Sequence, residues 1–251
     1  MTAARDAATD RLRMALLHFS SSRYINEQMP VPAQQKYISI AMKNPSSPSP
    51  APRQGRGRPR SFDRDAALAR AMRLFWERGY EGTSVADLTQ AMGITPPSLY
   101  AAFGSKEELY REVMAAYRAG PGLFTIRALD EEPDPRAAIR RLLRETAMAF
   151  TDPGQPAGCL ISTALITCAP EHDAVAAETA RLRRDTIAAI AACIRRGIAA
   201  GRWPAGTDAG ALARLYGAVI QGMSIQARDG AGRDELLAMV GQVMPDQVMP
   251  D

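Results

Sequence analysis

Arginine side chains gather between residues 53 and 60, where two glycines keep the chain flexible enough for each guanidinium to meet an anion. Residues 1–60 carry ten Lys/Arg against three Asp/Glu, a net charge of +7, so the remaining residues carry −3 of the chain's +4. Such a segment is typical either of a solvated tail or of an arm that binds nucleic acid. We define residues 55–60 as the basic arm; its arginines are Arg56, Arg58 and Arg60, with Arg53 just before it.

Cysteine and histidine are too sparse for the chemistry they most often carry. With three cysteines, no C-x-x-C pair and two histidines, the sequence predicts neither a disulfide framework nor a metal site. The common phosphate-loop, esterase and metalloprotease motifs are absent as well. We therefore expect no enzyme, no catalytic residue, no cofactor and no metal. The residues concerned are Cys159, Cys168, Cys193, His18 and His172.

The composition favours a globular protein of the cytoplasm. Hydrophobic residues make up 46% of the 251 positions, enough for one large or two ordinary domains. The most apolar helical stretch, residues 186–194, is bracketed by arginines and is far shorter than the roughly 20 apolar residues of a membrane span. The N-terminal segment shows no secretory signal. We expect a cytoplasmic protein with no membrane partner.

The sequence predicts that both ends of the chain are extensions of the folded part. Residues 44–53 are a proline and serine tract that predicts an extended linker, and residues 1–43 offer no second element for their one weakly amphipathic stretch to pack on. We expect residues 1–54 to be a disordered extension, with the natural start at Met1 or Met42. Residues 242–246 are repeated at once as 247–251, and we interpret residues 244–251 as a tail.

Helical signals begin directly after the basic arm. Asp63 is a capping residue, apolar residues follow it at the spacing of one buried stripe, and Gly79 is typical of a helix end. A second helix starts at Ser84, which forms a capping box with Asp87.

Gly93 ends the second helix and only Ile94 separates it from the next start. Thr95 is an N-cap and Pro96 occupies the first helical position, where a missing N–H costs nothing. Two short helices joined by a tight glycine-containing turn, braced by an earlier helix, form a helix-turn-helix over about residues 84–103.

A fourth helix opens at Ser105 with a second capping box, to Glu108. It places Lys106 in its first turn, where the helix dipole disfavours a cation. A phosphate approaching this helix start would reverse that preference, which makes Lys106 a candidate DNA-backbone contact; the alternative is a solvated lysine.

At this point the chain resembles the N-terminal DNA-binding domain of the TetR family of transcriptional regulators, over about residues 61–121. About fifteen positions agree in order and spacing, which makes the resemblance specific. They are Arg60-Ser-Phe-Asp, Ala71-x-x-Leu74-Phe75-x-x-x-Gly79-Tyr80-x-x-Thr83-Ser84 and Gly93-Ile-Thr-x-x-Ser98-Leu99-Tyr100-x-x-Phe103-x-Ser105-Lys106-Glu107-x-Leu109.

The resemblance implies an all-α homodimer in which the third helix enters the major groove of double-stranded DNA. A larger helical domain, residues 122–243, would dimerise and bind a small-molecule effector that changes the spacing of the two DNA-reading heads. Positions matching the family's phosphate contacts are Thr83, Tyr100 and Lys106, and those facing base edges are Thr95, Pro96, Pro97 and Ser98.

The chain departs from the family's commoner pattern at the pairs 96–97 and 101–102, which are Pro-Pro and Ala-Ala. Neither residue type donates hydrogen bonds to bases from its side chain, so we expect apolar contacts, for example to thymine methyl groups. Thr95, Ser98, the phosphate contacts and the basic arm would then carry more of the recognition.

The second half of the chain also predicts helices, at residues 137–150, 172–200, 208–227 and 234–243, with a short apolar segment at 159–167. Arginines including Arg183 are assigned to the wet side of the long second helix. By analogy with the family, residues 175–200 and 209–228 form the dimer interface. We expect a ligand cavity between residues 136 and 167, lined by Met148, Phe150, Cys159, Leu160, Thr163 and Leu165.

The sequence therefore predicts a repressor that binds a palindromic operator as a homodimer and is released by a small molecule. One alternative is a ligand-independent architectural DNA-binding protein, whose marker would be a filled core. Another is a redox-sensing regulator acting through Cys159 or Cys168, for which the sequence shows no neighbouring cation to lower a thiol pKa.

Overall fold

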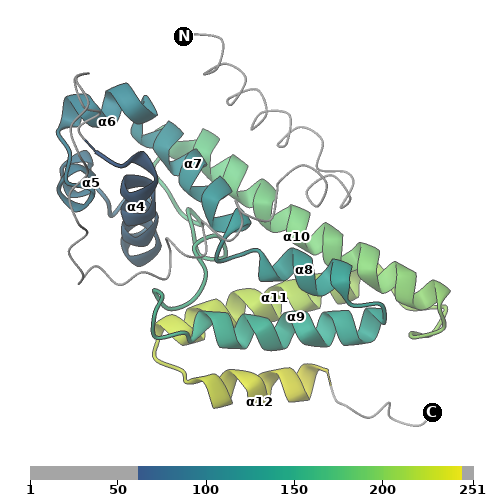
Figure 1. Ribbon diagram of the computed structural model, residues 1–251. Helices are drawn as coiled ribbons and strands as arrows, with labels where there is room; N and C mark the ends of the chain where they lie inside the picture. The colour runs from purple at the N-terminus through teal and green to yellow at the C-terminus, as the bar shows by residue number, and fades with distance from the viewer. Residues whose placement is uncertain (1–61, 245–251) are drawn as a thin grey trace, which may run out of the picture.

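The computed structural model describes residues 62–244, and within that range the chain is helical with no strand (Figure 1). This confirms the predicted all-α fold. The predicted extension, linker and basic arm, with Arg56, Arg58 and Arg60, lie outside the described residues. The helices are α4 (Arg64–Arg78), α5 (Val85–Met92), α6 (Pro96–Phe103), α7 (Lys106–Ala119), α8 (Phe124–Glu131), α9 (Pro135–Phe150), the 3-10 turn η1 (Pro170–His172), α10 (Asp173–Ala199), α11 (Ala209–Arg228) and α12 (Arg233–Val243).

Capping side chains set the boundaries of α4 to α6 as the sequence predicts. Asp63 accepts hydrogen bonds from the first backbone N–H groups of α4, and Gly79 ends that helix. Ser84 and Asp87 make both halves of the capping box of α5. Gly93 follows α5 with a φ of +69°, a left-handed conformation that costs glycine little. These local contacts fix the tight turn between α5 and α6.

The inner faces of α4 to α7 share one core. Phe75 of α4, Leu88 of α5 and Leu99 of α6 are fully buried, and the ring of Tyr110 on α7 meets Phe75 edge-on with ring centroids 5.0 Å apart. At the entry to α4, Arg64 forms an ion pair with Glu112 of α7. The helix-turn-helix is therefore held against α7 as a unit.

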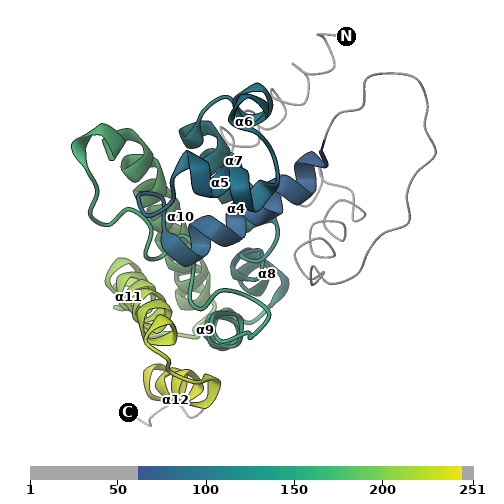
Figure 2. The same ribbon diagram turned by 90° about the vertical axis from the view of Figure 1, so that its left-hand side faces the viewer.

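Helices α8 to α12 form the rest of the molecule, with α4 to α6 at one end and α12 at the other in both views (Figures 1 and 2). The long α10 packs on α9 and α11, and its first turns reach back to α7, where Glu178 pairs with Arg111 at 2.8 Å. Met244, the first residue of the predicted tail, is buried and accepts a hydrogen bond from Tyr216.

The sequence reading missed one helix, α8. Its N-cap position is Leu123, which offers no side-chain oxygen to cap the helix, so the usual start signal is lacking. α8 instead packs closely on α9, and its residues Ala128 and Leu129 are buried. Tertiary packing rather than local sequence stabilises this helix.

A close backbone approach joins the loop after α9 to α11. Gly158 has a φ of +76°, and a Cβ there would lie 2.6 Å from the Ser224 carbonyl oxygen. The Ser224 hydroxyl accepts a 2.8 Å hydrogen bond from the backbone N–H of Cys159. Four residues further along α11, Arg228 donates a hydrogen bond to the Trp76 carbonyl of α4. The end of α11 therefore contacts both the loop after α9 and the helix α4 that precedes the helix-turn-helix.

We predict that Gly158→Ala destabilises the protein more than Gly201→Ala does. Both glycines have a positive φ, but a Cβ at Gly201 meets nothing within 4 Å. Both variants lose about 1 kcal/mol to backbone strain, and Gly158→Ala loses a further 1–3 kcal/mol, roughly, to the clash. Urea unfolding checks this; equal losses in the two variants would contradict the close approach.

Candidate nucleic-acid interface and ligand cavity

The N-terminal face of α6 points to solvent. Leu99 and Phe103 anchor the helix in the core, while Thr95, Pro96 and Pro97 are exposed. Ser98 is half-buried, and these four predicted base-reading residues are therefore brought together on one accessible surface. Further along α6, Tyr100 has half of its surface exposed, so its ring and hydroxyl are accessible to a partner.

The Thr95 and Ser98 hydroxyls form a pair. Thr95 Oγ1 accepts from the Ser98 backbone N–H and lies 2.9 Å from Ser98 Oγ. One hydroxyl proton is used between the two side chains, so the other proton and the remaining lone pairs are available to bases. At the start of α6, this pair of hydroxyls supplies the side-chain hydrogen-bonding groups, since the two residues between them are prolines.

Lys106 has a structural partner that sequence reading did not find. Its Nζ lies 4.2 Å from the centroid of the Tyr80 ring, a cation–π contact. Burial lowers the pKa of Lys106, and the nearby carboxylate of Glu81 opposes this shift. The Tyr80 ring thus supplies one reason for a cation at this helix start; the predicted phosphate contact stays a prediction.

Thr83 is the predicted phosphate contact whose side chain the fold already uses. It is fully buried, and its hydroxyl donates a 2.7 Å hydrogen bond to the Gly79 carbonyl at the end of α4. The hydroxyl thereby satisfies a carbonyl that the helix end leaves unpaired. Its contact with a phosphate stays a prediction.

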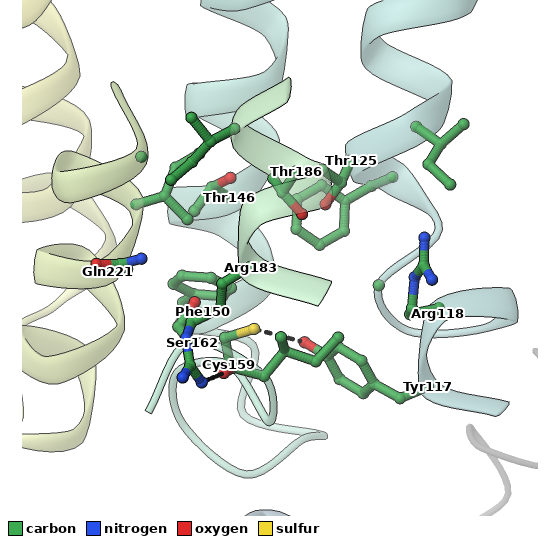
Figure 3. Close-up of a pocket in the computed structure, with 17 residues that line it drawn as sticks. Tyr117, Arg118, Thr125, Thr146, Phe150, Cys159, Ser162, Arg183, Thr186 and Gln221 are labelled. Carbon is green, nitrogen blue, oxygen red and sulfur yellow. Dashed lines mark hydrogen bonds between the residues drawn. The ribbon is translucent and has the colours of Figure 1, made fainter. Parts of the chain in front are cut away.

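A cavity of about 80 Å³ lies among the ends of α7 and α9, the segment after α9, and the middle of α10 and α11 (Figure 3). Its wall combines aromatic and aliphatic side chains with hydroxyls, an amide and two guanidinium groups. Residues that line it include Tyr117, Arg118, Phe124, Thr125, Thr146, Phe150, Cys159, Ser162, Arg183, Thr186, Ile187, Ile220 and Gln221.

Only some of the residues that line this cavity are predicted from the sequence. Phe150 and Cys159 line it, whereas Met148, Leu160, Thr163 and Leu165 do not. Met148 is 41% exposed on the outer side of α9, and Leu160 is buried away from the cavity. Most of the wall comes from α7, α8, α10 and α11, which lie outside residues 136–167. Helical periodicity predicts which side chains are buried. It does not predict where the packing between helices leaves a cavity.

The predicted position of Arg183 on the wet side of α10 is wrong. Its guanidinium lines the cavity and donates hydrogen bonds to the carbonyls of Ile161 and Ala164. These carbonyls belong to the turns after α9, which make no regular helix; the Ile161 carbonyl also accepts the Ala164 backbone N–H at 3.4 Å. A surface pattern of arginines does not distinguish this residue from its neighbour Arg184, which is exposed.

Tyr117 and Cys159 connect the cavity to the DNA-binding unit. The Tyr117 hydroxyl points at the Cys159 sulfur and donates a 3.4 Å hydrogen bond to it (Figure 3). Burial raises the pKa of Tyr117 well above its usual value, so the phenol is a neutral donor. On its other side the Tyr117 ring meets Trp76 of α4 edge-on, with centroids 4.9 Å apart.

The cysteines lack the environment of a reactive thiol. Burial raises the pKa of Cys168, and the carboxylates of Asp173, Glu81 and Glu171 raise it further, which lowers the thiolate fraction. Cys159 is buried and engaged by Tyr117. In the part of the chain that the structure describes, no group of His, Cys, Asp or Glu is arranged to hold a metal ion.

Two family models match the chain at the two regions just described. The model of bacterial regulatory proteins of the tetR family matches residues 67–113, and that of the tetracyclin repressor-like C-terminal domain matches residues 135–238. The HTH-type transcriptional repressor ComR of Escherichia coli strain K12 is 36% identical over 189 residues, 74% of this chain and 89% of ComR. The chain belongs to the TetR family.

Other TetR-family proteins support the same assignment. The HTH-type transcriptional repressor BdcR of Escherichia coli strain K12 is 30% identical over 72% of this chain and 86% of BdcR. Among solved structures, a cysteine mutant of the TetR family regulator CifR, complexed with 26bp double-strand operator DNA, is 47% identical. It matches with a TM-score of 0.73 over 76% of this chain and 100% of the CifR chain.

No helix among residues 62–244 combines the length and the apolar character that crossing a membrane requires. The TetR-family regions account for most of this described range.

We predict that Thr83→Val lowers the free energy of unfolding by about 1–3 kcal/mol, because it leaves the Gly79 carbonyl without its donor inside the fold. Thr125→Val is the matched control, since no hydrogen bond of the Thr125 hydroxyl occurs among the described residues. Chemical denaturation of both variants measures the difference. An unchanged stability in Thr83→Val would contradict a structural role for this hydroxyl.

Proposed function

We propose that this TetR-family protein is a repressor that binds an inverted-repeat operator as a homodimer and is released by a small organic effector. The observation that carries the proposal is the accessible face of α6, with Thr95 and Ser98 at its start and Tyr100 beyond them. CifR, bound to operator DNA in the solved structure, is similar over the same region. The basic arm would add contacts in the adjacent minor groove. A repressor that binds an operator must lie in the compartment that holds the DNA, so we propose that this protein acts in the cytoplasm.

The outer face of α10 and α11 supports homodimerisation. Leu215 and Ile225 of α11 are 52% and 48% exposed, unusual for large aliphatic side chains. The same two helices carry small exposed residues that permit close helix approach, namely Ala188 and Ala189 of α10 and Ala211 and Ala218 of α11. A two-fold axis through this face would pair the same patch with itself and bury Leu215 and Ile225 of both subunits.

The cavity favours a ligand-responsive regulator over a purely architectural protein. An architectural dimeriser would have a filled core, whereas a cavity of about 80 Å³ adjoins Tyr117, the residue that also contacts α4. A ligand that binds better in one arrangement of these helices shifts the population toward that arrangement. Release follows if the favoured arrangement no longer matches adjacent major grooves.

Selection of bound DNA from a random duplex pool tests the proposal. With the full chain at near-physiological salt, we expect an enriched inverted repeat whose half-sites lie about one helical turn apart. That result supports both the reading helix and the two-fold dimer. Salt-sensitive binding with no enriched sequence would overturn the operator-specific function in favour of the architectural one.

We predict that Lys106→Ala weakens binding to every DNA sequence about equally and reduces the slope of log affinity against log salt by about 1, since one phosphate contact is lost. Lys106→Arg should keep the slope. Arg233→Ala is the control, because Arg233 is an exposed cation of α12, and α12 lies at the opposite end of the molecule from α6 (Figure 2). Titrations at several salt concentrations measure the slopes; equal slopes for Lys106→Ala and Arg233→Ala would rule out the phosphate contact.

A further inference from the structure

Arg183 presents a positive charge to the cavity from the middle of α10. One of its nitrogens, Nη1, donates to the Ile161 carbonyl at 3.1 Å and to the Ala164 carbonyl at 2.8 Å. A guanidinium has five N–H donors, and among the described residues no acceptor meets Nε or Nη2. The side chain is therefore held in place through one nitrogen, and its other donors remain for a ligand.

No carboxylate compensates this charge in the cavity wall, which contains Arg183 and Arg118 but no Asp or Glu. Of the acids nearby, Asp185 of α10 pairs with Arg181 at 3.2 Å and also opposes the lowering of the Arg118 pKa by burial, and Glu145 of α9 pairs with Arg141 at 2.7 Å. Burial lowers the pKa of the Arg183 guanidinium, as expected where a cation lacks full solvation. Burying the charge of Arg183 in part, with no carboxylate beside it in the cavity wall, costs free energy, and a bound anion would relieve that cost.

The rest of the wall suits the other parts of a small amphipathic anion. Ser162 and Gln221 add neutral hydrogen-bonding groups, and neither side chain has a hydrogen bond to the described part of the protein. Phe150, Ile187 and Ile220 provide apolar surface for a short alkyl group. A volume of about 80 Å³ is roughly six times the space that one water molecule needs, so the cavity fits a molecule of about six heavy atoms.

We propose that the cavity binds a short-chain organic carboxylate, with the carboxylate on the free donors of Arg183 and the alkyl group against Phe150, Ile187 and Ile220. The effector of this regulator then belongs to the class of small organic carboxylates. This inference rests on the proposed ligand-responsive function. Arg183 is the selectivity residue, because it favours an anion over a neutral amide of the same shape and repels an amine.

Butyrate, butyramide and butylammonium form a probe series of one size and three charges. Added to the full-length protein at matched ionic strength, butyrate should raise the thermal unfolding midpoint in a concentration-dependent way, because it binds the folded state. Butyramide and butylammonium should leave the midpoint unchanged. A response to butyramide equal to that to butyrate would overturn the proposal.

Arg183→Gln removes the charge and should weaken butyrate binding at least tenfold, roughly, by calorimetry. The matched control is Arg184→Gln, which removes the same charge from the exposed neighbouring position and should leave the dissociation constant within about twofold. If Arg183 only supports the carbonyls of Ile161 and Ala164, Arg183→Gln lowers stability but binds butyrate as the unmodified protein does. That result would contradict the anion site.

A second variant keeps the test decisive if Arg183→Gln does not fold. Gln221→Glu places a carboxylate in the cavity with almost no change of shape and leaves Arg183 in place, so it should abolish the response to butyrate. Gln226→Glu makes the same change at an exposed position of α11 and should retain the response. Undiminished butyrate binding by Gln221→Glu would overturn the proposal.

Operator binding separates this inference from the proposed function. If butyrate binds through Arg183 and lowers affinity for the selected operator, both are supported. If it binds in the same way without changing operator affinity, the anion site stands and release by an effector is overturned. If an uncharged compound releases the operator while butyrate neither binds nor releases it, the proposed function stands and the carboxylate class is wrong.

Discussion

The packing of one side chain, Tyr117, links the two halves of the molecule. Its hydroxyl donates to Cys159 in the cavity wall, and its ring packs edge-on against Trp76 of α4. The backbone at Gly122 packs closely against the same ring, and a Cβ at that position would lie only 2.8 Å from it. A change in the shape of the cavity that displaces this ring therefore also disturbs α4, since close-packed interiors transmit displacement rather than absorb it.

The sequence predicts the DNA-binding half well because its signals are local. Ser84, Thr95 and Ser105 each cap a helix that begins at the next residue, and a hydrogen bond over three positions is readable from the order of residues alone. Gly93 marks the intervening turn for the same reason. The accessible face of α6 follows, since burying Leu99 leaves the opposite positions in solvent.

The cavity depends instead on distances between helices, which no local pattern contains. Phe150 and Cys159 lie within residues 136–167, where the sequence predicts the cavity, but most of the other residues of its wall come from helices outside that range. Arg183 shows the limit most clearly: it and Arg184 are adjacent arginines, yet one meets the carbonyls of Ile161 and Ala164 and the other meets solvent. Only the path of the segment after α9 distinguishes them.

α7 gives the two sites a common rigid element. It begins at Lys106, beside the DNA-reading helix, and its 14 residues extend about 21 Å to the cavity residues near its other end. Arg64 pairs with Glu112 midway and Tyr80 packs on Lys106, so a shift of α7 carries α4 to α6 with it. A ligand that prefers the shifted arrangement by about 1.4 kcal/mol changes its population relative to the DNA-binding arrangement tenfold. In the proposed complex, the ion pair between a carboxylate and the partly buried Arg183 would supply that much, so a ligand of a few heavy atoms would control binding to a much larger DNA partner.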